Sequence, residues 1–173
     1  WRHAPTSLAG DLLTLLFRIL FRLEVRGLEH LPKKGERCII ALNHVSFLDA
    51  GAILSVLPRQ PVFAVDLAIS QKWWVRPFLH FVRAIPLDPT KPLGTRTLVN
   101  AVKDGDPLVI FPEGRLTRTG SLMKIYEGAG LIADKAEAKI LPVRIDGLQF
   151  TPLSRMQGRA RRRWFPPLAI TIL

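Results

Sequence analysis

The sequence has very little cysteine: Cys38 is the one cysteine among 173 residues. A single cysteine cannot form an intrachain disulfide, which excludes the small disulfide-rich secreted class and favours a reducing compartment. Because Cys38 stands in an apolar run, we interpret it as a small buried hydrophobic residue rather than a nucleophile. The sequence also shows no signal peptide, internal repeat or low-complexity segment.

Acidic residues are scarce toward the C-terminal end, where none follows Asp146. The formal net charge is +11, and a late cluster of arginines contributes to it: Arg155, Arg159, Arg161, Arg162 and Arg163. Such a cluster suits nucleic acid, anionic lipid or an acidic protein. The sequence carries no nucleic-acid-binding motif and no interleaved stacking aromatics, so we expect no nucleic-acid partner.

The length and the hydrophobic content of 48% are sufficient for one domain with a substantial core. The first residue is Trp1 rather than Met, and residues 168–173 resemble a strand that stops in mid-course. We therefore expect this sequence to be part of a longer fusion protein. Within it we expect a membrane-interface helix and lead-in at residues 1–26 and a single α/β domain at residues 27–173.

Residues 7–23 have the pattern of a helix with an unusually wide apolar face. The polar residues fall at helical spacing and form one narrow stripe: Ser7, Asp11, Thr14, Arg18 and Arg22. The run is too short and too charged to cross a bilayer of roughly 30 Å. We therefore predict an amphipathic helix in the membrane interface, with Leu12, Leu16 and Phe17 inserted. The alternative is a helix packed on the core, and periodicity alone does not separate the two.

A second aromatic-rich stretch covers residues 69–83. It contains the adjacent tryptophans Trp73 and Trp74, flanked by Lys72 and Arg76. Tryptophans beside basic residues are typical of interfacial anchors, so we assign both to the membrane. Pro77 predicts that this helical stretch is kinked or split.

The remaining pattern alternates strands with helices. Apolar runs predict strands at residues 23–26, 38–42, 62–65, 84–87, 108–111 and 140–145, and helical periodicity favours residues 48–57, 95–103 and 128–136. Alternation at this spacing indicates an α/β fold with a mostly parallel central sheet flanked by helices.

The junction between the strand at 38–42 and the helix at 48–57 contains a candidate catalytic pair. His44 in the loop and Asp49 in the first helical turn allow the carboxylate to reach back to the ring, fix one imidazole nitrogen as protonated and leave the other free as a base. Asn43 and Ser46 place short polar groups beside it. The alternative is a plain helix N-terminus, capped by Ser46 and favoured electrostatically by Asp49.

A second candidate site follows the strand at 108–111. Ligands of α/β sheets collect at the carboxyl ends of strands, where this loop and the His44 loop are both expected. Gly114 allows a close backbone approach, and Arg115 offers a planar fork for a phosphate. Glu113 can orient a substrate, or it can simply pair with Arg115.

The sequence of both loops, Asn43-His44-(four residues)-Asp49 and Phe111-Pro112-Glu113-Gly114-Arg115, resembles the first and third motifs of the glycerolipid and lysophospholipid acyltransferase family. Residues 141–143 resemble the fourth motif. His80 stands where the second motif usually has glycine, before Phe81 and Arg83, and the resemblance implies phosphate binding by Arg83. The resemblance covers nearly the whole chain.

Several further stretches, residues 61–65, 69–71, 86–90 and 119–126, are similar to one subgroup. It is the acyltransferase domain of bacterial 2-acylglycerophosphoethanolamine acyltransferase, fused to an acyl-[acyl-carrier-protein] synthetase domain and sometimes to a lysophospholipid transporter. The resemblance implies a lysophospholipid substrate, an acyl carrier protein partner, an anionic membrane surface and the cytoplasmic face of the bacterial inner membrane.

The implied reaction transfers a fatty acyl group from a thioester, on acyl carrier protein or coenzyme A, to the sn-1 hydroxyl of 2-acyl-glycerophosphoethanolamine. His44 would act as general base, Asp49 would hold the imidazole, and Glu113 and Arg115 would position the glycerophosphate. No G-x-S-x-G turn is present, so we predict direct attack without an acyl-enzyme. We expect neither a metal nor a cofactor beyond the thioester co-substrate.

Two alternatives remain open. One is a lysophosphatidate acyltransferase that makes phosphatidic acid, with the same chemistry and a different acceptor. The other is a non-catalytic module that docks on membranes and binds phospholipid without turning it over.

Overall fold

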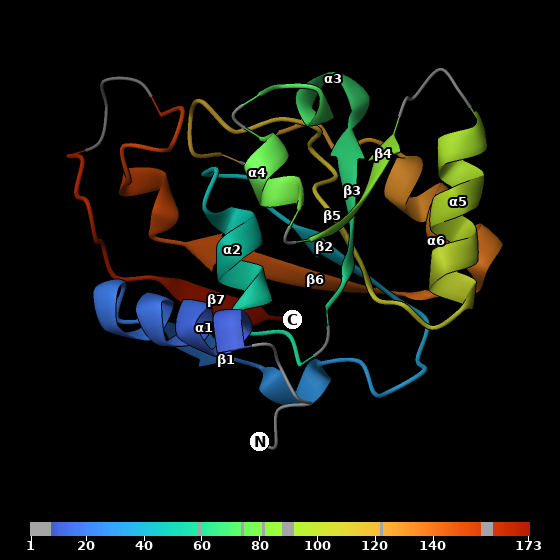
Figure 1. Ribbon diagram of the computed structural model, residues 1–173, viewed down its shortest axis with the longest axis horizontal. Helices are drawn as coiled ribbons and strands as arrows, with labels where there is room; N and C mark the ends of the chain where they lie inside the picture. Colours follow the sequence, from blue (N-terminus) through green and yellow to red (C-terminus); the bar gives the residue numbers. More distant parts are fainter. Residues whose placement is uncertain are drawn as a thin grey trace.

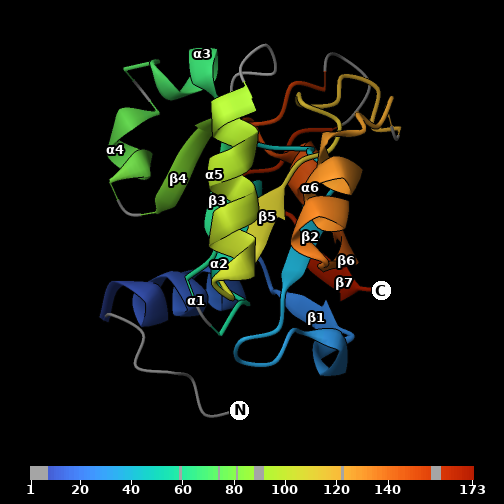
Figure 2. The same cartoon turned by 90° about the vertical axis from the view of Figure 1, so that its right-hand side faces the viewer.

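The structure is a computed structural model that describes residues 8–58, 60–73, 75–80, 82–87, 92–121, 123–156 and 161–173. A seven-stranded sheet in the order β1-β7-β6-β2-β5-β3-β4 forms its centre, with helices on both faces (Figures 1 and 2). All neighbouring strands pair in parallel except β6 and β7, which are antiparallel. The predicted α/β fold with a mostly parallel sheet is confirmed.

The strands are β1 (Glu24–Arg26), β2 (Cys38–Leu42), β3 (Val62–Asp66), β4 (Arg83–Leu87), β5 (Leu108–Ile110), β6 (Lys139–Asp146) and β7 (Ala169–Ile172). The helices are α1 (Leu8–Leu20), α2 (Asp49–Leu54), α3 (Leu67–Ser70), α4 (Arg76–Leu79), α5 (Pro92–Lys103) and α6 (Gly128–Ala136), with 3₁₀ turns η1 (Leu28–His30) and η2 (Leu148–Phe150).

The central strands are apolar on both faces because helices cover both sides of the sheet. In β2, Ile40 faces a core shared with α1 and α2, whereas its neighbour Ile39 faces a core shared with α5 and α6. Both side chains are fully buried. This double burial explains why residues 38–42 form a continuous apolar run rather than an alternating one.

Helix α1 is partly a core helix, which corrects the assignment of Phe17 to the membrane. Phe17 is only 4% exposed and stacks on Phe21. The Thr14 hydroxyl donates a hydrogen bond of 3.2 Å to the Ser55 carbonyl after α2. Side chains on the outer face of α1 remain exposed: Leu12 62%, Leu15 53%, Leu16 47% and Ile19 66%. One face therefore packs on the domain, and the other is left without a protein partner among the described residues.

The aromatic stretch at 69–83 is split, as Pro77 suggested, into α3 and α4. Pro77 is the second residue of α4, where its missing N–H leaves no helical hydrogen bond unmade. Trp73, between the two helices, is 81% exposed. Trp74 lies outside the described residues, as does Phe81. Within the described chain no helix is long and apolar enough to span a membrane.

The sheet brings the two candidate loops together. Strands β2 and β5 are parallel neighbours, with Ala41 paired with Ile110. The loops that follow them, containing His44 and Glu113, therefore leave the same edge side by side. Arg83 is the first residue of β4, so it lies at the opposite, amino-terminal edge of the parallel sheet.

Candidate active site

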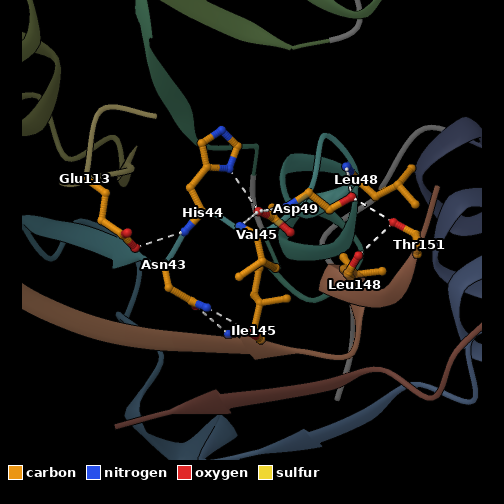
Figure 3. A network of polar contacts seen from close by, with 10 residues as sticks. Asn43, His44, Val45, Leu48, Asp49, Glu113, Ile145, Leu148 and Thr151 are labelled. Atoms are coloured by element: carbon orange, nitrogen blue, oxygen red, sulfur yellow. Dashed lines mark hydrogen bonds and ion pairs between the residues drawn. The ribbon is translucent and has the colours of Figure 1, made fainter. Parts of the chain in front are cut away.

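The expected contact between His44 and Asp49 is present. His44 Nδ1 lies 2.9 Å from Asp49 Oδ2, and Figure 3 shows the other ring nitrogen, Nε2, directed away from the carboxylate. The His44 side chain is 21% exposed, whereas that of Asp49 is fully buried. In the neutral imidazole, an Nδ1–H that donates to the carboxylate leaves Nε2 as the nitrogen that can accept a proton.

Asp49 holds the loop as well as the ring. Its Oδ2 also accepts hydrogen bonds from the backbone N–H groups of Val45 at 2.7 Å and Ser46 at 2.9 Å. Its Oδ1 is buried and accepts no hydrogen bond from any residue that the structure describes. Burial raises the pKa of the Asp49 carboxyl above its ordinary value, while the hydrogen bond from His44 and the two backbone N–H groups oppose that rise.

The His44 ring is fixed from its other side by the second loop. The ring stacks on Phe111, with centroids 4.0 Å apart and planes inclined by 24°. The His44 N–H donates to Glu113 Oε1 at 3.3 Å, and the His44 carbonyl accepts from the Thr117 N–H at 2.8 Å. The imidazole is therefore held by its ring, its backbone and its carboxylate partner, an arrangement that suits a preorganised base.

Glu113 lies beside the His44 loop and binds backbone groups through both of its carboxylate oxygens. It is 2% exposed, and its second oxygen, Oε2, accepts a hydrogen bond from the Met123 N–H at 3.2 Å. Both oxygens thus bind backbone N–H groups, so Glu113 joins the His44 loop to the segment after β5. The alternative pairing with Arg115 is not found among the described residues, and the expected contact of Glu113 with the glycerophosphate stays a prediction.

Asn43 and Ser46 also hold the loop in place through hydrogen bonds. The Asn43 amide accepts from the Ile145 N–H at 2.7 Å and donates to the Ile145 carbonyl at 2.9 Å (Figure 3). Ser46 is completely buried, and its hydroxyl lies 3.1 Å from that of Thr151. Because Thr151 donates its own proton to Leu148, Ser46 is the donor in this pair. The complete burial of Ser46 corrects its assignment to substrate binding, whereas that of Asn43, which lines the cavity described below, stays a prediction.

Gly114 and Arg115 lie on the loop after β5, and phosphate binding by them stays a prediction. Gly114 has a φ of 64°, in the left-handed region, and a Cβ there would meet the Tyr126 ring at 3.4 Å. Arg115 is exposed on the same loop, and the structure records no ion pair for it within the described chain. Its guanidinium is therefore available to an anionic ligand.

Arg83 is removed from the candidate site. Its guanidinium Nη1 forms an ion pair of 2.8 Å with Asp106 Oδ2, before β5. Both residues lie at the amino-terminal edge of the sheet, away from His44. The physical reason is the register of β4, in which Arg83 pairs with Val62 at the start of β3.

The structure adds residues that the sequence did not indicate. Phe111 supports the imidazole through its ring, and Thr117 and Ile145 bind loop residues through their backbones. Phe111 is part of the motif Phe111-Pro112-Glu113-Gly114-Arg115, but the motif did not predict that its ring stacks on His44. Backbone hydrogen bonds place no demand on side-chain identity, so no sequence pattern points to Thr117 or Ile145.

A cavity of about 810 Å³ opens beside these loops. Its lining includes Asn43, Val45 and Glu113 from the candidate site and apolar groups farther along, such as Ile125 and Ile140. A largely apolar cavity of this size can hold a flexible hydrocarbon chain. Among the described residues, no group of three or more His, Cys, Asp or Glu side chains gathers as metal ligands.

Comparison with known proteins identifies the family. The sequence model described as Acyltransferase matches residues 22–146, which include both loops. The chain belongs to the acyltransferase family. The match assigns a family and not a substrate.

Curated relatives of this acyltransferase-family chain are identical to it at about a quarter of the aligned residues. It is 26% identical over 134 residues to a chloroplastic 1-acyl-sn-glycerol-3-phosphate acyltransferase of Brassica napus, covering 73% of this chain and 38% of that protein. It is 28% identical over 127 residues to a protein of the same description from Bacillus subtilis, covering 72% and 62%. The chain thus spans between about two fifths and three fifths of these relatives' lengths.

A solved structure has the same fold. The crystal structure of a 1-acyl-sn-glycerophosphate acyltransferase from Thermotoga maritima superimposes with a TM-score of 0.68 at 21% identity, covering 95% of this chain and 67% of that one. At this identity the likeness establishes the architecture of the acyltransferase-family domain alone.

Proposed function

We propose that this chain transfers a fatty acyl group from a thioester to the free hydroxyl of a lysophosphatidate, giving phosphatidic acid. The observation that carries the proposal is the His44–Asp49 contact of 2.9 Å, with the second imidazole nitrogen directed away, at the carboxyl edge of an acyltransferase-family sheet. This geometry supplies a general base where a ligand is expected to bind.

The proposed chemistry follows from these groups. His44 Nε2 removes the proton of the acceptor hydroxyl while that oxygen attacks the thioester carbonyl carbon. The new C–O bond forms, the C–S bond breaks, and the imidazolium returns the proton to the leaving thiolate. Asp49 stabilises the transient imidazolium through its buried carboxylate, where the low dielectric strengthens the attraction.

The acceptor differs from the one first expected. The relatives described above are named as 1-acyl-sn-glycerol-3-phosphate acyltransferases, and their names favour lysophosphatidate over 2-acyl-glycerophosphoethanolamine. The second candidate acceptor, 2-acyl-glycerophosphoethanolamine, is still supported by the resemblance of residues 61–65 and 119–126 to the subgroup named in the sequence analysis. Arg115 is the proposed phosphate ligand, and the cavity of about 810 Å³ is the proposed site of an acyl chain.

An acceptor panel tests the proposal. Lysophosphatidate, lysophosphatidylethanolamine and lysophosphatidylglycerol are each offered with acyl carrier protein and coenzyme A thioesters, and product is measured by mass spectrometry. Lysophosphatidate is expected to give the highest kcat/KM. A preference for lysophosphatidylethanolamine with an acyl carrier protein thioester would show that the proposed acceptor is wrong, while the proposed acyl transfer would stand. Vesicle binding with no transfer from any donor would favour the non-catalytic module instead.

The absence of an acyl-enzyme is proposed as well. The thiol of Cys38 is buried in β2 and burial raises its pKa to about 11, which makes it a poor nucleophile at neutral pH. We expect intact-protein mass spectrometry after a single turnover to show no added acyl mass. An acylated intermediate that reacts on at a competent rate would contradict direct attack.

The membrane assignment also stays a proposal. Leu12 and Leu16 remain exposed on α1, and Trp73 lies exposed before α4. We propose that this face of α1 rests on the cytoplasmic leaflet of a bacterial inner membrane, within a larger protein that includes further domains and meets acyl carrier protein. Replacing Leu12 and Leu16 with serine should reduce co-sedimentation with anionic vesicles, while undiminished pelleting would contradict it.

A further inference from the structure

The segment before β7 combines exposed aromatic side chains with the arginine cluster. Trp164 is 73% exposed and Phe165 50%, and Arg161, Arg162 and Arg163 directly precede them, all exposed. Arg159 lies outside the described residues. Exposed tryptophan next to several arginines has the composition of a membrane-interface anchor, where the indole sits at headgroup level and the cations meet anionic lipid.

This segment is joined to α1. The Phe165 ring meets that of Phe21 edge-on, with centroids 5.6 Å apart, just beyond the end of α1. In Figure 1 the segment that leads into β7 runs down one side of the molecule to that end of the helix. Phe21 is itself buried, so this contact fixes Phe165, which is half exposed, at the C-terminal end of α1.

The same segment also leads to the candidate active site. The Arg163 N–H donates to the Phe150 carbonyl at 2.9 Å, and the Phe47 N–H donates to the Leu153 carbonyl at 3.2 Å. Phe47 is three residues from His44, and Arg155 stands over its ring at 5.7 Å. Exposed apolar side chains thus follow one another from the His44 loop to Trp164: Phe47 40%, Leu153 47% and Phe150 38%.

We propose a second membrane-docking surface. It consists of the exposed apolar residues Phe47, Phe150, Leu153, Trp164 and Phe165, here called the loop strip, together with Arg161, Arg162 and Arg163. Its occupant is a bilayer surface rich in anionic phospholipid. The strip runs from the C-terminal end of α1, where Phe165 contacts Phe21, to the edge of the His44 loop. A lipid hydroxyl then reaches the imidazole while the lipid's chain stays in or near the bilayer.

The combination of groups favours a bilayer over an acidic carrier protein. Arginines alone would suffice for an acidic protein, but they do not account for the exposure of Trp164, Leu153 and Phe165 beside them. Transferring these apolar surfaces from water to the interface is favourable, and the arginines add an attraction of about fivefold each to anionic lipid. The inference goes beyond the proposed reaction because binding is measured without turnover.

Vesicle partitioning tests the charged half of the surface. Co-sedimentation with vesicles of phosphatidylcholine, alone or mixed equally with phosphatidylglycerol, is compared for the wild type and the triple variant R161Q/R162Q/R163Q. The triple variant should lose on the order of 100-fold in affinity for the anionic vesicles. The matched control R96Q/K103Q/K135Q removes three exposed charges from α5 and α6, on the other face of the sheet, and should lose much less.

The apolar half is tested by W164S against L93S, since Trp164 and Leu93 are both 73% exposed and Leu93 lies on α5. W164S should weaken binding about tenfold and L93S should not. In a variant with Trp1, Trp73 and Trp74 changed to Phe, the emission of Trp164 should shift to the blue and be quenched by brominated lipid.

Three results would overturn the proposal. The first is an unchanged emission of Trp164 on vesicles that bind the protein. The second is an equal loss of vesicle affinity for the arginine triple variant and its control. The third is that the triple variant loses binding to an isolated acyl carrier protein and keeps its vesicle affinity. The last result would assign the cluster to the carrier. Transfer activity is also measured on detergent-solubilised substrates. Because loss of membrane docking does not affect that activity, this assay distinguishes failure of the docking proposal from failure of the proposed reaction.

Discussion

Removing the charge of Asp49 tests whether the carboxylate acts through His44. In Asp49→Asn, the amide oxygen can take the place of Oδ2 and keep its contacts with His44, Val45 and Ser46 at 2.7–2.9 Å. The NH₂ group then occupies the place of Oδ1, which is buried and has no partner among the described residues. An unsatisfied buried donor costs about 1–3 kcal/mol of stability.

The effect on rate should be larger than the effect on stability. The amide oxygen still accepts from Nδ1–H, but the neutral amide no longer stabilises the imidazolium that forms during the reaction. We expect kcat to fall by roughly 10²–10⁴-fold, the range for a general base and its partner. His44→Ala should lose at least about 10²-fold.

The double variant H44A/D49N tests whether the two residues act as a unit. Its rate is measured by single-turnover acyl transfer. Because the negative charge of Asp49 affects the rate through the ring, and the amide of the variant keeps the contacts with the loop, Asp49→Asn should cost no more than about threefold in the His44→Ala background. Losses that multiply would show that the carboxylate acts independently of the imidazole. Asp66→Asn, which alters the exposed aspartate that caps α3, controls for a change of charge remote from the site.

Further perturbations address single features. Phe17→Ala should cost about 3–5 kcal/mol in urea unfolding because the ring is 4% exposed, whereas a membrane-facing Phe17 would cost almost nothing. Arg115→Gln should raise KM for lysophosphatidate about tenfold or more through loss of a charged hydrogen bond, while Arg83→Gln, paired with Asp106, should leave KM unchanged. For Cys38, burial raises the folded-state pKa from 9.0 to about 11. The unfolded chain therefore loses this proton first, and wild type should lose stability relative to Cys38→Ala as pH rises from 9 to 11, by at most about 3 kcal/mol.

The sequence predicted the elements that periodicity and composition determine. The run at residues 38–42 and the helix at 128–136 have the predicted bounds in the structure. The expected helix at 48–57 is shorter, because α2 ends at Leu54 and the chain continues in turns to Pro58. Adjacency of the two loops followed from the rule that parallel strands place their carboxyl ends at one edge.

The side-chain roles were less predictable, for a physical reason. Periodicity shows that α1 has a wide apolar face, but not which part of that face another helix covers, so Phe17 and Leu16 looked equivalent. The polar residues of the motifs were likewise recognisable, yet Glu113 and Asn43 bind backbone groups of segments 10 and 102 residues away. Such contacts depend on tertiary placement and leave no local pattern.

The hydrogen bonds of Asp49 distinguish the two interpretations of the His44 loop. A residue that caps a helix accepts from N–H groups two or three positions after it. Asp49 instead accepts from Val45 and Ser46, which precede it, and α2 begins after Leu48 with no side-chain cap. Capping therefore does not explain this carboxylate. A fully buried carboxylate whose Oδ1 has no partner in the described part of the chain is costly for stability. Holding the imidazole and its loop is the role that its contacts do explain.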